Sequence, residues 1–140
     1  MWTQKHTSGD ASETGLIKFC QPILDIEATR KQDPIFKYNK DDGKEVECVI
    51  PFSSDIKFNL AIRKSSQSGN LVVYMKGAPE RIINRCTTIL INGEKQPIRS
   101  NEYLELVQKA NTSFGNRGER VLAFARLELD PSVFPVDPAY

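Results

Sequence analysis

The sequence has few of the residues that build metal centres, disulfide frameworks and membrane spans. It contains one histidine, His6, and three cysteines, Cys20, Cys48 and Cys86, in 140 residues. The cysteines are odd in number and widely spaced and form no C-x-x-C pair, which predicts reduced thiols in a cytosolic setting and no metal site. No apolar run approaches the roughly 20 residues that span a bilayer, and the N-terminus has no apolar signal-peptide segment.

The sequence also lacks an excess of positive or negative charge. The chain has 19 basic and 18 acidic side chains, and its net charge is +1. This balance gives no broad field that would hold nucleic acid or an anionic membrane. Neither a G-x-x-x-x-G-K-[ST] loop nor a G-x-G-x-x-G turn occurs, which argues against P-loop and Rossmann nucleotide sites. Because the charge is balanced and these motifs are missing, any recognition of a phosphorylated ligand must be local. A Cys/His nucleophile pair would depend on His6 alone.

The pattern of apolar residues predicts helices separated by polar segments. We expect a single domain over residues 1–140, with extended ends at 1–8 and 131–140 and a loop at 30–44 that holds a possible short strand. The expected helices cover residues 10–21, with Asp10 or Ser12 as the N-cap and a possible restart through 23–26, then 79–84 and 101–114, with Gly115 and Gly118 as stop signals.

Alternating and continuous apolar runs predict the strands. They lie at about 46–52, 57–64, 71–75, 87–91, 95–98 and 121–129, and Asn92-Gly93 is a hairpin turn signal. The first three strands are consecutive and joined by short links, which predicts an antiparallel meander. The fold class is therefore α+β: a twisted antiparallel sheet of about six strands, flanked by helices in two layers.

One stretch points to an anion. The apolar run 71–75 stops at Lys76, Gly77 permits a sharp turn and a close approach, and Pro79 suits the first position of a helix. The strand would deliver the Lys76 ammonium beside free backbone N–H groups, which together attract a phosphate. The alternative is an ordinary strand-to-helix turn with a solvated lysine.

Four segments, in this order and spacing, resemble one family. They are GDASE at 9–13, PFSSDIKFN at 51–59, KGAPER at 76–81 and GERVLAF at 118–124. The chain resembles the nucleotide-binding (N) domain of P-type cation-transporting ATPases, most closely that of the sodium/potassium and proton/potassium pumps. The resemblance implies the N-domain fold, a cytoplasmic position in a pump of the plasma membrane, and ATP as the ligand.

In that family the domain holds ATP while the γ-phosphate passes to an aspartate on a separate phosphorylation domain. The aspartate belongs to an Asp-Lys-Thr-Gly-Thr motif, which this sequence lacks, together with the acidic Mg²⁺-binding motifs. The resemblance therefore implies a fragment of an ion-transporting hydrolase that binds ATP and ADP without hydrolysing them. Mg²⁺ would be needed by the whole pump and not for binding here. The implied partners are the phosphorylation and actuator domains, no nucleic acid is expected, and the fragment itself is expected to be soluble and monomeric.

The resemblance also implies a set of ATP-binding residues and no catalytic residue or metal ligand. They are Glu13, Phe52, Lys57, Asn59, Lys76, Gly77, Ala78, Arg120 and Leu122. Phe52 would stack on adenine and Glu13 would accept from its exocyclic amine. Lys76 would lie at the inner end of the pocket, with Gly77 and Ala78 leaving room for the purine. Asn59 departs from the family's usual glutamine at this position.

Arg120 would grip the phosphate chain bidentately, and Lys57 would lie at the edge of the pocket. Each residue also has a structural alternative. Phe52 could belong to the core, Glu13 could complete a helix cap, Lys57 could be a solvated strand lysine, and Arg120 could pair with Glu119.

A function of another class remains open on the sequence alone. The chain could be a soluble interaction or regulatory module that binds no nucleotide. Its contact faces would carry Ile82, Ile83 and Tyr103.

Overall fold

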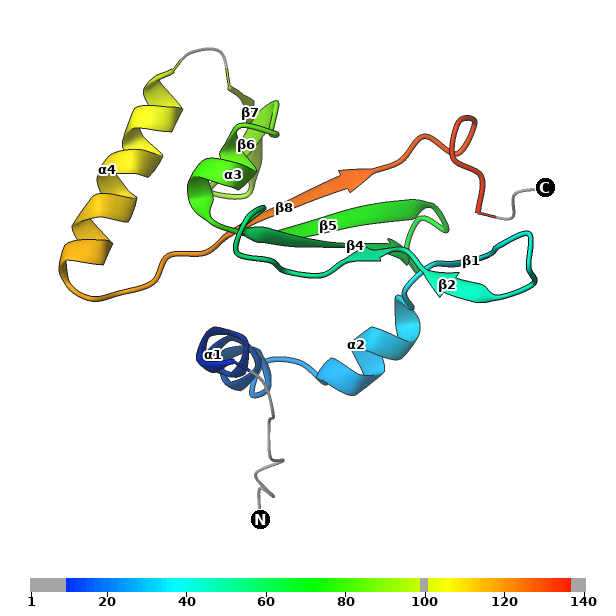
Figure 1. Cartoon of the computed structure of the whole chain (residues 1–140). Coiled ribbons are helices and arrows are strands. Elements are labelled where there is room, and N and C mark those ends of the chain that lie inside the picture. The colour runs from blue at the N-terminus through cyan, green and yellow to red at the C-terminus, as the bar shows by residue number, and fades with distance from the viewer. Residues whose placement is uncertain (1–9, 99–100, 137–140) are drawn as a thin grey trace. The chain divides into compact units, whose positions relative to one another are not determined.

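The computed structural model describes residues 10–98 and 101–136 (Figure 1). The chain divides into two compact units, Met1–Pro34 and Ile35–Tyr140. The expected extended end at 1–8, which includes His6, lies outside the described residues, and so do residues 137–140 of the expected C-terminal tail. The single domain over 1–140 stays a prediction.

Two capped helices make up the described part of the first unit. Helix α1 covers Ala11–Cys20, and its N-cap is Asp10, whose carboxylate accepts from the backbone N–H groups of Ser12 at 2.7 Å and Glu13 at 3.0 Å. The predicted cap is confirmed for Asp10. Helix α2 covers Ile26–Gln32, where the carboxylate of its N-cap Asp25 accepts from the N–H groups of residues 27 and 28.

Helix α2 corrects two sequence expectations. The restart begins at Ile26 and not at Ile23, because Asp25 supplies the side-chain acceptor that a helix start needs. The helix also extends into the first residues of the expected 30–44 loop.

A four-stranded antiparallel sheet is the centre of the second unit. Its strands are β3 (Val49–Ile50), β4 (Phe58–Lys64), β5 (Leu71–Gly77) and β8 (Ala123–Glu128), in the order β3-β4-β5-β8. The predicted meander is confirmed by the β3-β4-β5 pairings. Among the described residues, Leu71 and Val72 of β5 and Pro79 and Ile82 of the following helix are buried apolar residues.

Two small sheets accompany the central one. Strands β1 (Lys37–Asn39) and β2 (Glu45–Glu47) pair antiparallel, as do β6 (Thr88–Ile91) and β7 (Glu94–Pro97). Asn92 and Gly93 form the two-residue turn of the β6-β7 hairpin with φ of 51° and 85°, as their sequence signal predicts.

The α+β class with antiparallel sheets and flanking helices is confirmed. The described residues form eight strands in three sheets, where about six strands in one sheet were predicted. The predicted strand 46–52 is divided at Cys48, whose N–H donates to Phe36 O and whose carbonyl accepts from the N–H of Ile62.

The described part of the second unit also contains helices α3 and α4. Helix α3 covers Pro79–Ile83 and contacts β5, β8 and α4 (Figure 1). Helix α4 covers Glu102–Asn116, and Tyr103 near its start donates from its hydroxyl to Gln96 of β7 at 3.2 Å. Helix α3 therefore connects the central sheet with α4.

The C-terminal end of α4 is closed by a Schellman motif. Gly118 has φ of +77°, its N–H donates to Gly115 O at 2.9 Å, and the N–H of Glu119 donates to Phe114 O at 3.0 Å. Gly118 is a stop signal, as predicted. Gly115 is not, because it lies inside α4 with helical hydrogen bonding.

The segment after β8 also differs from expectation. Extended chain was predicted from Pro131, but the N–H groups of Val133 and Phe134 both donate to Asp130 O, and the Asp130 carboxylate accepts from Ser132. Residues 130–134 therefore form a turn, because the aspartate offers a local acceptor to three successive groups.

Candidate functional site

Three side chains from three adjacent strands share one face of the central sheet. In the register of the sheet Lys76 of β5 lies opposite Asn59 of β4 on one side and opposite Phe124 of β8 on the other. Directly opposite residues of antiparallel strands point to the same face. Lys76 and Asn59 are half-buried, whereas Phe124 is 61% exposed. The sheet thus brings two of the predicted site residues together beside an exposed aromatic ring.

The opposite face of the sheet at this end carries other residues of the same strands. Phe58, Gly77 and Ala123 are register partners there, one residue out of phase with Lys76. The Arg85 guanidinium, which follows α3, lies 5.0 Å from the centre of the Phe58 ring. This contact places the end of α3 on the Phe58 face, so the face with Lys76 is the other one.

Gly77 approaches the start of β4 too closely for a side chain. A Cβ at this position would overlap the Lys57 carbonyl oxygen and lie 2.6 Å from the Cα and Cβ of Phe58. The N–H of Ala78 donates to the same Lys57 carbonyl at 2.9 Å. The geometry therefore gives a different reason for glycine than room for a purine, since the missing side chain would point at β4 and away from the Lys76 face.

An open pocket of about 410 Å³ lies where β4 begins, β5 ends and the chain approaches β8. It is lined by Lys57, Ala78 and Arg120, three of the predicted site residues. The remaining lining comes from both helices of this unit and from the segment between α4 and β8: Pro79, Glu80, Asn111, Gly115, Gly118, Glu119 and Val121. Residues separated by more than 60 positions thus line a single depression.

The backbone at Lys57 and Arg120 explains how these two cations reach the pocket. Lys57 has φ of +60°, and its N–H donates to Ser53 O at 2.9 Å, so a one-turn loop ends at this lysine. Arg120 directly follows the Schellman motif, whose last residue is Glu119. The Glu119 carboxylate lies 3.2 Å from Arg117 Nε, so the ion pair that the structure shows for Glu119 joins it to Arg117.

Phe52 lies in the loop between β3 and β4 and is 61% exposed. The alternative that Phe52 belongs to the core is therefore wrong. Its position directly before the 53–57 turn is accessible to a ligand, although Phe52 does not line the 410 Å³ pocket. A ring this exposed is available for stacking.

The other predicted residues are not brought into the pocket. Glu13 lies in the first turn of α1, in the first unit, where its N–H donates to the cap residue Asp10. Leu122 is half-buried and directly precedes β8. The structure thus gathers Lys57, Ala78 and Arg120 at the pocket, and it pairs Asn59 with Lys76 on the sheet.

Sequence reasoning missed two residues of this region. Phe124 belongs to the predicted strand 121–129, but only the pairing of β8 with β5 places it opposite Lys76. Asn111 lies on the helix that was predicted for 101–114, and it is half-buried beside the pocket. A polar residue in phase with the apolar side of α4, four positions after Val107, was the available signal for Asn111.

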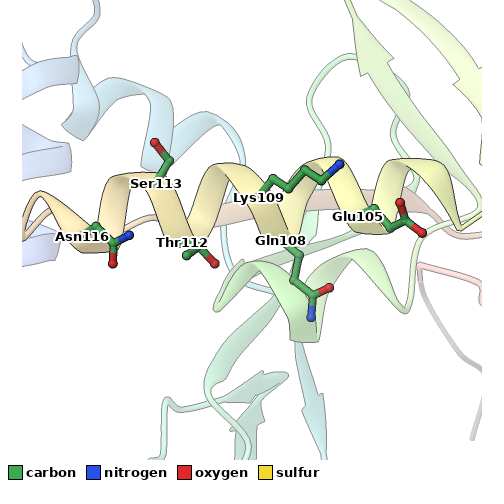
Figure 2. A pocket seen from close by; sticks show the side chains of 6 residues that line it. All are labelled: Glu105, Gln108, Lys109, Thr112, Ser113 and Asn116. Atoms are coloured by element: carbon green, nitrogen blue, oxygen red, sulfur yellow. The ribbon is translucent and has the colours of Figure 1, made fainter.

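A second, larger depression contains none of the predicted site residues. It measures about 620 Å³, and its described lining is a polar strip of α4: Glu105, Gln108, Lys109, Thr112, Ser113 and Asn116. Figure 2 shows that all six side chains belong to this one helix. All six are exposed, so the strip offers no desolvated group that would recognise a specific ligand.

The contact faces of the alternative function are not surface faces. Ile82 is 2% exposed and belongs to the core, and Ile83 and Tyr103 are half-buried. Ile82 is therefore not available as a partner surface, and Ile83 and Tyr103 are only partly accessible. The geometry does not favour the interaction module.

The cysteines and acidic side chains add no further chemistry to the site. Burial raises the pKa of the Cys48 and Cys86 thiols, which favours their neutral form. The Cys86 thiol donates to Ile82 O at 3.3 Å. Within residues 10–98 and 101–136 no three His, Cys, Asp or Glu side chains are grouped to hold a metal ion, and no helix is long and apolar enough to cross a bilayer.

Comparison with known proteins gives a consistent family. Residues 2–138 match the family model described as P-type ATPase, cytoplasmic domain N. Over 136 residues, 94% of this chain, the sequence is 37% identical to the sodium/potassium-transporting ATPase subunit alpha of Hydra vulgaris. Over 130 residues, 91% of this chain, it is 42% identical to the potassium-transporting ATPase alpha chain 2 of Cavia porcellus. The matched region spans only 12% and 11% of the length of these two relatives.

Proposed function

We propose that this chain, which belongs to the family of P-type ATPase cytoplasmic N domains, binds ATP and ADP as the nucleotide-holding part of a cation pump. The family membership rests on the match over residues 2–138. The nucleotide itself is the proposal, and it rests on how the second unit arranges its cations and rings.

The single observation that carries the proposal is the convergence of Lys57, Ala78 and Arg120 on one pocket. Two cations in the lining of this open depression can bind a phosphate chain, the guanidinium bidentately and the ammonium as a point charge, beside the carboxylates of Glu80 and Glu119 in the same lining. The chain's net charge of +1 supplies no general attraction for anions, so these two side chains would provide the local one.

The purine needs a flat apolar surface and a few polar groups at its rim. Phe52 and Phe124 are the most exposed rings on β4, β5, β8 and the loop before β4, and Lys76 with Asn59 forms a polar pair beside Phe124. Stacking of a base on an aromatic ring contributes about 1 to 3 kcal/mol. We propose that adenine binds on the Lys76 face, with Gly77, Ala78 and Leu122 forming the adjoining backbone. The role of Glu13, which belongs to the first unit, stays a prediction.

The chain is not expected to turn ATP over. Its sequence has no Asp-Lys-Thr-Gly-Thr motif, so the acceptor of the γ-phosphate would belong to a separate phosphorylation domain of a longer pump. The proposed partners of the parent protein are therefore its phosphorylation and actuator domains, and the parent would couple ATP hydrolysis to cation transport with Mg²⁺. Binding to this chain is proposed to need no Mg²⁺, because ring stacking and the two cations provide the contacts.

A titration of isotope-labelled protein tests the proposal. ATP or ADP is added in buffer with EDTA, and amide chemical shifts are followed. We expect saturable changes at Phe52, Lys57, Lys76 and Arg120 and none at Gln108 or Ser113 of the α4 strip. An absence of change at the first four residues at millimolar nucleotide would overturn the proposal. Release of inorganic phosphate from ATP would contradict the expectation that the chain only binds.

A further inference from the structure

Asn111 is the polar residue that α4 contributes to the pocket lining. It lies on α4 and lines the depression together with Lys57 and Arg120. It is half-buried, whereas the polar strip on the same helix is exposed. Within the described residues its carboxamide has no hydrogen-bonding side chain or backbone group as partner. A half-buried amide without a protein partner is available to a ligand or to water.

The chemistry of a carboxamide differs from that of the two cations. Lys57 and Arg120 can only donate, and they match the acceptor oxygens of phosphate. The amide of Asn111 offers both a donor and an acceptor within one group. A vicinal diol such as that of ribose presents the same combination, because each hydroxyl can donate and accept. The pocket therefore contains groups for two different parts of one nucleotide.

From this arrangement we infer that Asn111 hydrogen-bonds the ribose hydroxyls of the bound nucleotide and is a specificity residue for ribonucleotides. The inference rests on the proposed nucleotide binding. Lys57 and Arg120 hold the phosphates in the same pocket, so the sugar that carries them lies within the reach of the α4 side chain. The selected ligand class is a ribonucleoside polyphosphate in preference to its deoxy analogues.

The test compares ATP with 2′-deoxy-ATP and 3′-deoxy-ATP by calorimetry on the whole chain. We expect wild-type protein to bind ATP about 2- to 12-fold more tightly than at least one deoxy analogue, which corresponds to one neutral hydrogen bond. In Asn111→Ala this ratio should fall to about one, with the deoxy analogue bound as by wild type. Asn116→Ala is the matched control, because it makes the same substitution on the same helix outside the pocket, and it should keep the wild-type ratio.

Two further results separate the possible failures. Asn111→Leu preserves the side-chain shape without hydrogen bonds, and it should give the same ratio as Asn111→Ala if both are folded by circular dichroism. Wild type that binds all three nucleotides equally, or an Asn111 variant that keeps the wild-type ratio, would overturn the inference and leave nucleotide binding intact. Wild type that binds none of the three would contradict the proposed function itself.

Discussion

Gly77 and Phe58 are register partners on β5 and β4, and a Cβ added to the glycine would lie 2.6 Å from the Phe58 Cα. The neighbouring Ala78 N–H donates to the Lys57 carbonyl that the same Cβ would overlap. The obstacle is backbone, which cannot move away as a flexible side chain can. Gly77 thus controls how tightly the end of β5 joins the start of β4.

Gly77→Ala is expected to destabilise the protein by about 1 to 3 kcal/mol, as an overpacked interior position does. The measurement is the free energy of unfolding in urea. Gly115→Ala is the matched control, because a Cβ inside α4 meets nothing within 4 Å and alanine favours the helix by up to about 1 kcal/mol. A Gly77→Ala variant as stable as wild type that had only lost nucleotide binding would instead favour obstruction of a purine.

Phe52→Ala should weaken ATP binding by about 1 to 3 kcal/mol through loss of stacking. Because the ring is 61% exposed, the free energy of unfolding should change by no more than about 0.5 kcal/mol. Phe134→Ala removes another exposed ring, in the turn after β8, and should leave ATP affinity unchanged. Equal ATP affinity of wild type and Phe52→Ala would remove Phe52 from the site.

Local sequence signals predicted the elements well because each depends on near neighbours. The Asn92-Gly93 turn, the Asp10 cap and the Gly118 stop all act within a few residues, and all three are confirmed. The predicted strand 46–52 was divided because Cys48 bonds to Phe36 and Ile62, which are distant in sequence. The Asp25 cap was overlooked, and with it the correct start of α2.

The site was less predictable than the elements. The left-handed φ of Lys57 has no sequence signal, because lysine rarely adopts this conformation, and it follows from the turn that Ser53 closes. The position of Phe124 beside Lys76 depends on the register of β8 with β5, where a shift of one residue would turn the ring to the other face. Motifs could name the residues around a ligand, but only the pairing of strands far apart in sequence could assemble them.

Arg120→Ala is expected to weaken ATP binding by about 1.5 to 3 kcal/mol, the range for a hydrogen bond to a charged group. Adenosine has no phosphate, so its affinity should be unchanged, and the ratio of the two affinities is the measurement. Arg126→Ala is the matched control, because Arg126 lies on β8 outside the pocket lining, where its guanidinium is 3.8 Å from the Glu128 carboxylate. A similar loss for ATP in both arginine variants would indicate a general charge effect.

The last prediction concerns Glu128, which links β8 to the turn between β4 and β5. Hydrogen bonds from Ser68 and then Asn70 hold the pKa of this carboxyl below its usual value of 4.5, and the Asn70 Nδ2 to Glu128 Oε1 distance is 3.0 Å. A lowered pKa in the folded state contributes stability that is fully present above pH 4.5 and is lost as the pH falls through the folded-state pKa. Wild-type stability should therefore decline in acid below pH 4.5.

Glu128→Gln should lower the free energy of unfolding at pH 7, and its difference from wild type should shrink as the pH falls below 4.5. Urea unfolding at a series of pH values between 7 and 3 measures this difference. Ser68→Ala removes the donor with the largest effect and should reproduce part of the change without altering the charge of β8. A difference between wild type and Glu128→Gln that stays constant over the whole range would show that the Ser68 and Asn70 contacts do not favour the charged carboxylate in solution.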